Sequence, residues 1–128
     1  MKVETFIPTV YLVDDDPGAL MSLSFLLRAH DIAVEAFARP HDFLQHMPRQ
    51  PVGCLITDWL MPDMNGLELF EKMQALQWRL PTFILTAFGQ VSLCSLAIRA
   101  GVCDFIEKPL DPPTMLPRIL KALEKSAS

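Results

Sequence analysis

The sequence predicts a single α/β domain built on a doubly wound, five-stranded parallel sheet with helices on both faces. Three observations lead to this prediction. The chain has 128 residues, the length of one domain. Short apolar runs of strand character alternate five times with longer stretches of helical periodicity. Strands that alternate with helices form a parallel sheet, because each helix carries the chain back across one face of it.

The composition excludes several other classes of protein. Hydrophobic residues make up 51% and charged residues 20%, values typical of a compact domain and not of a disordered chain. The net charge of −4 predicts no basic surface for nucleic acid or for an anionic membrane. The three cysteines form no Cys-x-x-Cys pair and lie among apolar neighbours. With no signal peptide and no apolar run long enough to cross a bilayer, we expect a cytoplasmic protein without membrane contact.

The first strand and helix are predicted from one continuous stretch. Val10–Val13 is a short apolar run with β-branched and aromatic residues, and it stops at Asp14. Asp16 and Pro17 are typical of an N-cap followed by the first helical residue. Leucines at helical spacing then extend the helix to about Ala29.

The next two strands lie before and after a short helix. Ile32–Phe37 predicts the second strand, and Arg39-Pro40 begins a short helix that Pro48 and Pro51 end. The apolar residues of that helix are Phe43, Leu44 and Met47. Cys54–Thr57 predicts the third strand, which closes on Asp58.

A loop rich in turn-forming residues follows the third strand over residues 61–66. The helix after it carries an apolar stripe of Leu67, Phe70, Met73 and Leu76. Trp59, which directly follows Asp58, has two open interpretations: a partly exposed lid over the site, or a packing residue.

The last third of the chain contains two further predicted pairs of a strand followed by a helix. Thr82–Thr86 predicts the fourth strand, and residues 90–100 predict a helix that stops at Gly101. Cys103–Ile106 predicts the fifth strand, and the last helix extends from Asp111 to about Lys125.

Pro117 constrains the start of the last helix, because an interior proline costs a helix about 3 kcal/mol. With Thr114 as the N-cap, Pro117 would lie in the first turn and lose no hydrogen bond. The preferred register therefore begins at Thr114.

Polar side chains gather where the strands end. Asp14 and Asp15 follow the first strand, Asp58 the third, Thr86 ends the fourth and Lys108 follows the fifth. The carboxyl ends of parallel strands form the ligand-binding edge of such a sheet. One lysine cannot neutralise three carboxylates, and all-oxygen ligands with this charge suit Mg²⁺. A carboxylate beside Mg²⁺ and a lysine can attack phosphorus and form an aspartyl phosphate.

Four motifs in this order resemble a bacterial two-component response-regulator receiver domain over essentially the whole chain. They are the segments 13–16 (VDDD), 57–66 (TDWLMPDMNG), 86–87 (TA) and 104–109 (DFIEKP). The resemblance implies a flavodoxin-like sheet with strand order 2-1-3-4-5. It also implies a regulatory domain and not an enzyme, with only self-phosphorylation from small phosphodonors and self-dephosphorylation.

The resemblance further implies roles for individual residues. Asp58 would be the phosphoacceptor, supplied by a phosphohistidine on a sensor histidine kinase. Asp15, Asp58 and the backbone carbonyl of Leu60 would bind Mg²⁺ directly, and Asp14 would bind it through a water. Lys108 would pair with the phosphoryl group, with a cis peptide bond to Pro109.

The switch would begin at Thr86, with Ala87 beside it, as the threonine hydroxyl moves towards the phosphoryl oxygen. Phe105 would then turn inward, which changes the surface formed by the fourth helix, fifth strand and fifth helix. Leu60 and Phe88 would flank the path of the hydrolytic water. Neither side chain can hydrogen-bond a water, so slow self-dephosphorylation is expected.

The helix over residues 90–100 offers a candidate output surface. At 100° per residue, one side is predicted to face the core and consists of Val91, Cys94, Ala97, Ile98 and Gly101. Leu96 lies opposite with Arg99, and Leu93 lies on the flank. An exposed leucine there predicts a partner surface or a phosphorylation-favoured homodimer.

Two alternative functions remain open from the residues. Asp14-x-Asp16 imitates the signature of haloacid-dehalogenase-type phosphatases, although the late acidic pair and the cap domain of those enzymes have no counterpart here. The other alternative function is an unphosphorylated receiver-like interaction module.

The residues of the four motifs most resemble those of receivers attached to helix-turn-helix transcription domains. Residues 1–128 are therefore expected to be a receiver domain cut from a longer chain with a C-terminal output domain, through which alone DNA would be contacted.

Overall fold

The five strands form one parallel sheet. The structure, a computed structural model, describes residues 7–46, 51–87 and 91–127. The order across the sheet is β2-β1-β3-β4-β5, which confirms the predicted order. The strands are β1 (Thr9–Val13), β2 (Ala33–Phe37), β3 (Gly53–Asp58), β4 (Thr82–Thr86) and β5 (Asp104–Glu107).

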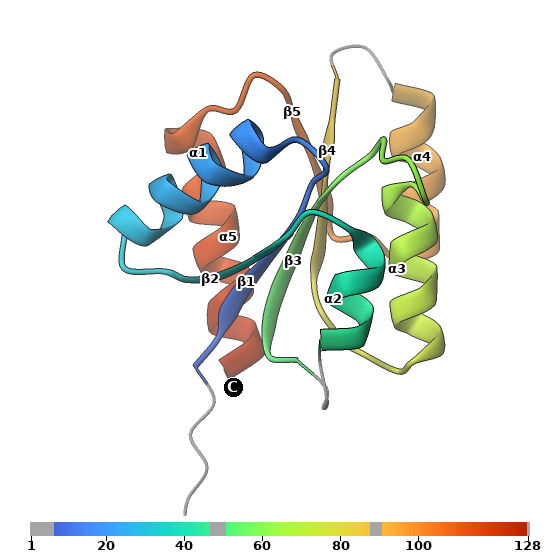
Figure 1. Cartoon of the computed structure of the whole chain (residues 1–128), viewed down its shortest axis with the longest axis horizontal. Helices are drawn as coiled ribbons and strands as arrows, with labels where there is room; N and C mark the ends of the chain where they lie inside the picture. The colour runs from blue at the N-terminus through green and yellow to red at the C-terminus, as the bar shows by residue number, and fades with distance from the viewer. Residues whose placement is uncertain (1–6, 47–50, 88–90, 128) are drawn as a thin grey trace, which may run out of the picture.

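Helices cover both faces of this sheet, as the sequence predicts. They are α1 (Pro17–Ala29), α2 (Pro40–His46), α3 (Gly66–Ala75), α4 (Val91–Ala100) and α5 (Pro112–Ala127). Helices α1 and α5 lie on one face, and α2, α3 and α4 lie on the other (Figure 1). In the part of the chain that the structure describes, no helix has both the length and the apolar character needed to span a membrane.

The sheet separates two hydrophobic cores, because successive side chains of a strand point to opposite faces. In β1, Val10 and Leu12 pack in the core beneath α1 and α5. Tyr11 and Val13 pack in the core on the other face, where Phe43 of α2 is fully buried. Strands buried on both faces in this way read as continuous apolar runs, which explains the sequence pattern.

The register of the strands brings their carboxyl ends to one edge of the sheet. The last residue of β1, Val13, pairs with Thr57 in β3, and the last residue of β4, Thr86, pairs with Glu107 in β5. The residues that directly follow these strands therefore share that edge. This alignment places the polar residues of the sequence motifs near one another.

Local signals predict the ends of two helices correctly. Asp16 is the N-cap of α1, where its carboxylate accepts the N–H of Gly18 at 3.0 Å, and Pro17 is the first helical residue. Gly101 follows α4 with φ +111°, a left-handed conformation that favours glycine.

Apart from the N-cap of the last helix, predicted boundaries agree with the structure within two residues wherever both can be compared. Cys103 was expected inside the fifth strand, but β5 begins one residue later and Cys103 is exposed, whereas Cys54 is buried. Met47, Pro48 and Gln90, which the predicted helices or their ends include, lie outside the described residues.

The predicted buried side of α4 is partly wrong. Ala97 is fully buried, but Ile98 is 49% exposed and Gly101 is exposed. A residue adjacent in sequence to Ala97 is turned by about 100° around the helix, so a narrow contact leaves it in solvent. Leu96 is 58% exposed, which confirms its predicted position on the outer face. The side chains of residues 91–94 lie outside the described part of the chain.

The predicted start of α5 is also wrong. The helix begins at Pro112, and the carbonyl of Asp111 accepts the N–H groups of Thr114 and Met115. Asp111-Pro112 therefore opens this helix as Asp16-Pro17 opens α1, and Thr114 is not the N-cap. As a result Pro117 lies inside the helix, where it has no N–H to donate to the carbonyl four residues earlier.

Pro117→Ala is expected to raise the free energy of unfolding by about 1–2 kcal/mol. The alanine restores one helical hydrogen bond, and the greater freedom of the unfolded chain offsets part of this gain. Pro117 is exposed, so the substitution leaves no cavity. Urea unfolding followed by circular dichroism measures the change.

Pro113→Ala is the matched control, because Pro113 is also exposed but lies in the first turn, where no helical bond is gained. Equal effects of the two substitutions would contradict the interior position of Pro117.

Candidate functional site

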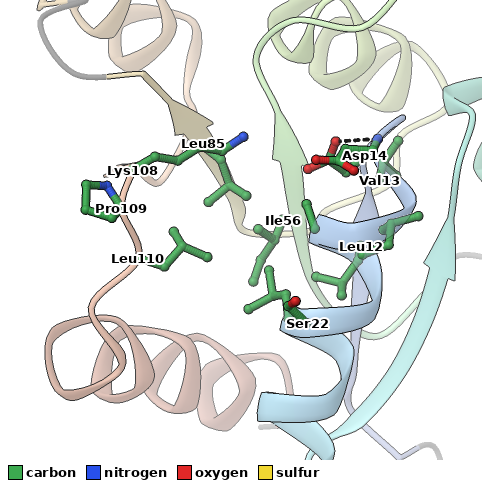
Figure 2. Close-up of a pocket in the computed structure, with 13 residues that line it drawn as sticks. Leu12, Val13, Asp14, Ser22, Ile56, Leu85, Lys108, Pro109 and Leu110 are labelled. Atoms are coloured by element: carbon green, nitrogen blue, oxygen red, sulfur yellow. Dashed lines mark hydrogen bonds between the residues drawn. The ribbon is translucent and has the colours of Figure 1, made fainter.

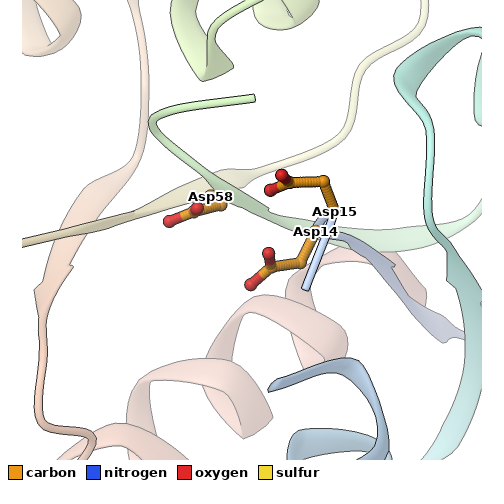
Figure 3. A group of neighbouring side chains, drawn as sticks. All are labelled: Asp14, Asp15 and Asp58. Atoms are coloured by element: carbon orange, nitrogen blue, oxygen red, sulfur yellow. The ribbon is translucent and has the colours of Figure 1, made fainter. Parts of the chain in front are cut away.

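Three carboxylates meet at the carboxyl edge of the sheet (Figure 3). Asp14 and Asp15 directly follow β1, and Asp58 is the last residue of β3. Each offers one oxygen, and these oxygens all lie within 4.8 Å of one another. Asp14 is buried at 4% exposure, the Asp58 side chain is 16% exposed, and Asp15 is exposed. The group is therefore open to solvent on the side of Asp15.

Burial and the arrangement of the three carboxylates change the pKa of Asp14. Burial raises the pKa of its carboxyl above the usual value, and the nearby Asp58 and Asp15 carboxylates raise it further. The N–H of Asp16, which donates to Asp14 Oδ1 at 3.0 Å, and the Lys108 ammonium both act to lower that pKa. The net rise means that ionising Asp14 costs more free energy in the folded state than in the unfolded chain.

Lys108 supplies one positive charge to the three carboxylates. Its Nζ donates to Asp58 Oδ1 at 3.1 Å. Its backbone N–H donates to the carbonyl of Thr86 at 2.8 Å, which holds the segment after β5 against the end of β4. The peptide bond between Lys108 and Pro109 is cis, which confirms that expectation.

Thr86 and Phe105 lie on neighbouring strands beside this group. Thr86 ends β4 and is only 3% exposed, and Ala87 after it is exposed. Phe105 lies in β5 opposite Ile84 and packs, half-buried, against the core on the α4 face. Thr86 thus belongs to the edge that carries Asp58, and Phe105 belongs to the adjacent strand.

The other predicted site residues lie further out or cannot be described. Leu60 follows Asp58 by two positions and is 64% exposed. Leu96 and Arg99 are exposed on α4. Phe88 lies outside the described residues, and so does the side chain of Leu93.

The loop after Asp58 shows a requirement that sequence reasoning missed. The N–H of Gly66 donates to the carbonyl of Trp59 at 2.9 Å, and a Cβ at Gly66 would lie 2.9 Å from the Asp58 carbonyl oxygen. Only glycine permits this close approach of the helix start to Asp58. The signal in the sequence is Asn65-Gly66, where Asn65 caps α3.

Two further contacts hold the same loop. Asn65 forms a capping box with Glu68, in which the Glu68 N–H donates to Asn65 Oδ1 at 2.8 Å and the Asn65 N–H donates to Glu68 Oε1 at 2.9 Å. Trp59 is 8% exposed in the core on the α2 face, which decides its role in favour of packing. The backbone next to Asp58 is therefore anchored on both sides.

The donor set fits Mg²⁺. All three side chains offer oxygen, which is the ligand that Mg²⁺ prefers, and their charge exceeds that of Lys108 by two. A divalent cation matches that excess. The exposure of Asp15 leaves one side on which waters can complete the coordination shell.

Comparison with known proteins places this geometry in a family. Residues 10–120 match the family model described as the response regulator receiver domain. The chain is 36% identical over 116 residues to the transcriptional regulatory protein FixJ of Rhizobium meliloti, a match that covers 91% of this chain and 57% of FixJ. It is 35% identical over 115 residues to the response regulator protein TodT of Pseudomonas putida, covering 90% of this chain and 51% of TodT.

Solved structures of response regulators superpose on this chain. The crystal structure of FixJ-N superposes with a TM-score of 0.83 at 35% identity, covering 95% of this chain and 96% of that one. The response regulator StyR superposes with a TM-score of 0.85 at 36% identity, covering 94% of this chain and 61% of that one.

These matches cover only part of the relatives' length. The chain spans only 51–57% of the length of FixJ and TodT, so they cover a receiver and not a complete regulator. They do not favour the haloacid-dehalogenase-type phosphatase that Asp14-x-Asp16 left open. Because one family model covers the sheet and the acidic edge together, the chain belongs to the response regulator receiver domain family.

Proposed function

We propose that this chain is a phosphorylation-controlled switch in which Asp58 accepts a phosphoryl group from a phosphohistidine of a sensor histidine kinase. The observation that carries the proposal is the environment of the Asp58 carboxylate. Its side chain is 16% exposed, and Lys108 Nζ lies 3.1 Å from one of its oxygens. Two further carboxylates flank it. A phosphodonor can therefore reach a nucleophile that lies beside one ammonium, and the remaining excess of negative charge is what Mg²⁺ would offset.

In the proposed reaction an Asp58 oxygen attacks phosphorus, so that an O–P bond forms and the P–N bond to the donor imidazole breaks. The Lys108 ammonium lies where it can offset charge on the phosphoryl oxygens. Mg²⁺, when bound, supplies further positive charge to the transferring group. Asp15, Asp58 and the Leu60 carbonyl would bind it directly, and Asp14 would bind it through a water.

Thr86 and Phe105 provide the proposed route from the reaction to a surface. Thr86 ends β4, the strand next to the one that carries Asp58, and half-buried Phe105 lies on β5, the following strand. A Thr86 hydroxyl drawn to the phosphoryl group, with Ala87 moving beside it, would let Phe105 turn inward. The surface of α4, β5 and α5 would then differ between the two states.

The proposed output is control of transcription by a DNA-binding domain elsewhere in a longer protein. Support comes from the matched relative FixJ, which is a transcriptional regulatory protein and extends well beyond the matched region. DNA contact would come only through that output domain. Exposed Leu96 and Arg99 on α4, with Leu93 on its flank, would form the surface for a phosphorylation-favoured homodimer. The chain itself would regulate and not turn over a substrate, apart from self-phosphorylation and self-dephosphorylation.

Acetyl phosphate with Mg²⁺ is expected to add one phosphoryl group to the native chain and none to Asp58→Asn. The amide cannot act as the nucleophile, whereas Asp63→Asn, an exposed acid in the following loop, should react as the native chain does. Intact mass spectrometry measures the product. A native chain that stays unmodified would favour the interaction module that works without phosphorylation.

Asp14→Asn is expected to raise the melting temperature of the metal-free protein at pH 7. The pKa of Asp14 is raised in the folded state, so the ionised carboxyl destabilises the fold above that pKa. As the pH falls through the raised pKa, the native protein gains the proton and the difference from the variant disappears. Added Mg²⁺ should stabilise the native protein by about 2.7 kcal/mol at a hundredfold excess over its Kd, and stabilise the variant less.

Asp16→Asn is the matched control, because asparagine caps a helix as well as aspartate does and Asp16 is exposed. Thermal unfolding from pH 5 to pH 8 would contradict the argument if Asp14→Asn and Asp16→Asn behaved alike.

Leu60→Asn is expected to change the rate of self-dephosphorylation by roughly tenfold, about 1.4 kcal/mol of barrier. Leu60 is exposed two residues after Asp58 and cannot orient a water, so the native aspartyl phosphate should decay slowly. The decay in excess Mg²⁺ after removal of the phosphodonor gives the rate. Leu76→Asn, at a half-exposed leucine after α3, should leave it unchanged. A native half-life of seconds that Leu60→Asn leaves unchanged would refute this role.

A further inference from the structure

A cavity of about 290 Å³ opens between α1 and the segment that joins β5 to α5 (Figure 2). It lies on the α1 and α5 face of the sheet, opposite the face that α2, α3 and α4 cover. One end of the cavity meets the acidic group, because Asp14 and Lys108 both line it. The cavity is therefore separate from the Mg²⁺ position but shares two side chains with it.

The walls of the cavity are almost entirely aliphatic. They come from four elements of the fold and from the segment before α5, and consist of Leu12, Leu20, Leu23, Ile56, Leu85 and Leu110. Leu20 and Leu110 are half-buried, so the cavity reaches the surface between them. Its volume is about ten times the roughly 30 Å³ that one water occupies in the liquid. An apolar hollow of this size with a few polar groups at one end is typical of a small-molecule site.

The polar end of the cavity carries more negative than positive charge. Asp14 and Asp16 contribute carboxylates, and the single ammonium, that of Lys108, is already bonded to Asp58. Asp14 Oδ1 is occupied by the N–H of Asp16, as the dashed line in Figure 2 shows. Its second oxygen accepts no hydrogen bond from the residues that the structure describes. A buried carboxylate oxygen is thus available to a donor that enters the cavity.

We propose that this cavity binds a small organic ammonium compound, with its apolar body against the leucines and its ammonium group on the carboxylate of Asp14. Apart from the hydroxyl of exposed Ser22, the walls provide no side-chain partner for a second polar group, so a compound with one charged end and one largely apolar end fits the cavity. An anion would meet Asp14 and Asp16 without a free cation to oppose them. The volume fits a body of about ten non-hydrogen atoms.

Such a ligand would compete with Mg²⁺, and this part of the inference rests on the proposed function. Its ammonium group and the metal would both draw on Asp14, and two cations held this close repel each other. Because linkage is reciprocal, each would weaken the binding of the other by the same factor. The compound would therefore oppose phosphorylation of Asp58 from the α1 side of the sheet.

The test is a titration of the ¹⁵N-labelled 128-residue chain in metal-free buffer with 2-phenylethylamine and, separately, with 2-phenylethanol. The two compounds have the same size and differ in the charge of one group. The amine should give saturable shifts of the amide signals of Leu20, Leu23 and Leu110, with a Kd near 1 mM or lower, a scale set by its few atoms. The alcohol should bind at least tenfold more weakly. No saturable shift with either compound would overturn the site, and equal binding of both would overturn the ammonium assignment.

Two variants locate the site. Ala19→Leu fills the cavity and should remove binding of both compounds, whereas Ala29→Leu, exposed on the same helix but outside the cavity, should not. Asp14→Asn keeps the cavity and should abolish the preference for the amine over the alcohol. Equal loss in the two alanine variants, or an unchanged preference in Asp14→Asn, would overturn the proposed position.

A second titration with Mg²⁺, followed by the amide signals of Asp15 and Trp59 in the ¹⁵N-labelled chain, measures the coupling. Saturating amine should weaken Mg²⁺ binding about tenfold. An unchanged Mg²⁺ affinity would overturn the competition. Absence of any Mg²⁺ binding would instead count against the proposed function, while the metal-free titration would still decide the ligand site.

Discussion

The repulsion among three carboxylates is the constraint on which the rest of this structure depends. The parallel register holds oxygens of Asp14, Asp15 and Asp58 within 4.8 Å of one another, and a single ammonium from Lys108 faces them. Burial raises the pKa of Asp14, and the Asp58 and Asp15 carboxylates raise it further. A site built in this way attracts a cation, because a cation reduces a repulsion that the fold itself maintains.

The surrounding backbone prevents the carboxylates from relaxing away from one another. The N–H of Trp59 donates to the carbonyl of Leu85 at 2.9 Å, which ties the residue after Asp58 to the neighbouring strand. Gly66 brings the start of α3 against the Asp58 carbonyl where no side chain would fit. Asp16 caps α1 and also bonds Asp14. Groups placed on strand ends and helix starts keep a fixed geometry, and preorganised charge is most effective when it cannot move.

The position of the acidic group at the sheet edge gives it access to both faces of the molecule. On the α4 face, Thr86 and Phe105 connect it to the α4 and β5 part of the proposed switch surface. On the other face, the aliphatic cavity beneath α1 ends at Asp14 and Lys108. A phosphoryl group, a metal and a cavity ligand would thus act on one set of charges from different directions. The two faces remain separate because the sheet divides the two cores.

The sequence by itself determined the fold class, the order of elements and the identity of the residues at the strand ends, because each depends on a local pattern such as an apolar run that stops at an acid. It also brought Asp58 and Lys108 into one predicted group. Only the tertiary structure decided the features that depend on distant segments: the close approach that requires Gly66, the exposure of Ile98, and the helix register that leaves Pro117 in an interior position. It also showed the cavity beneath α1. Periodicity gives the direction of a side chain from its own helix, but burial and space depend on what packs against that helix.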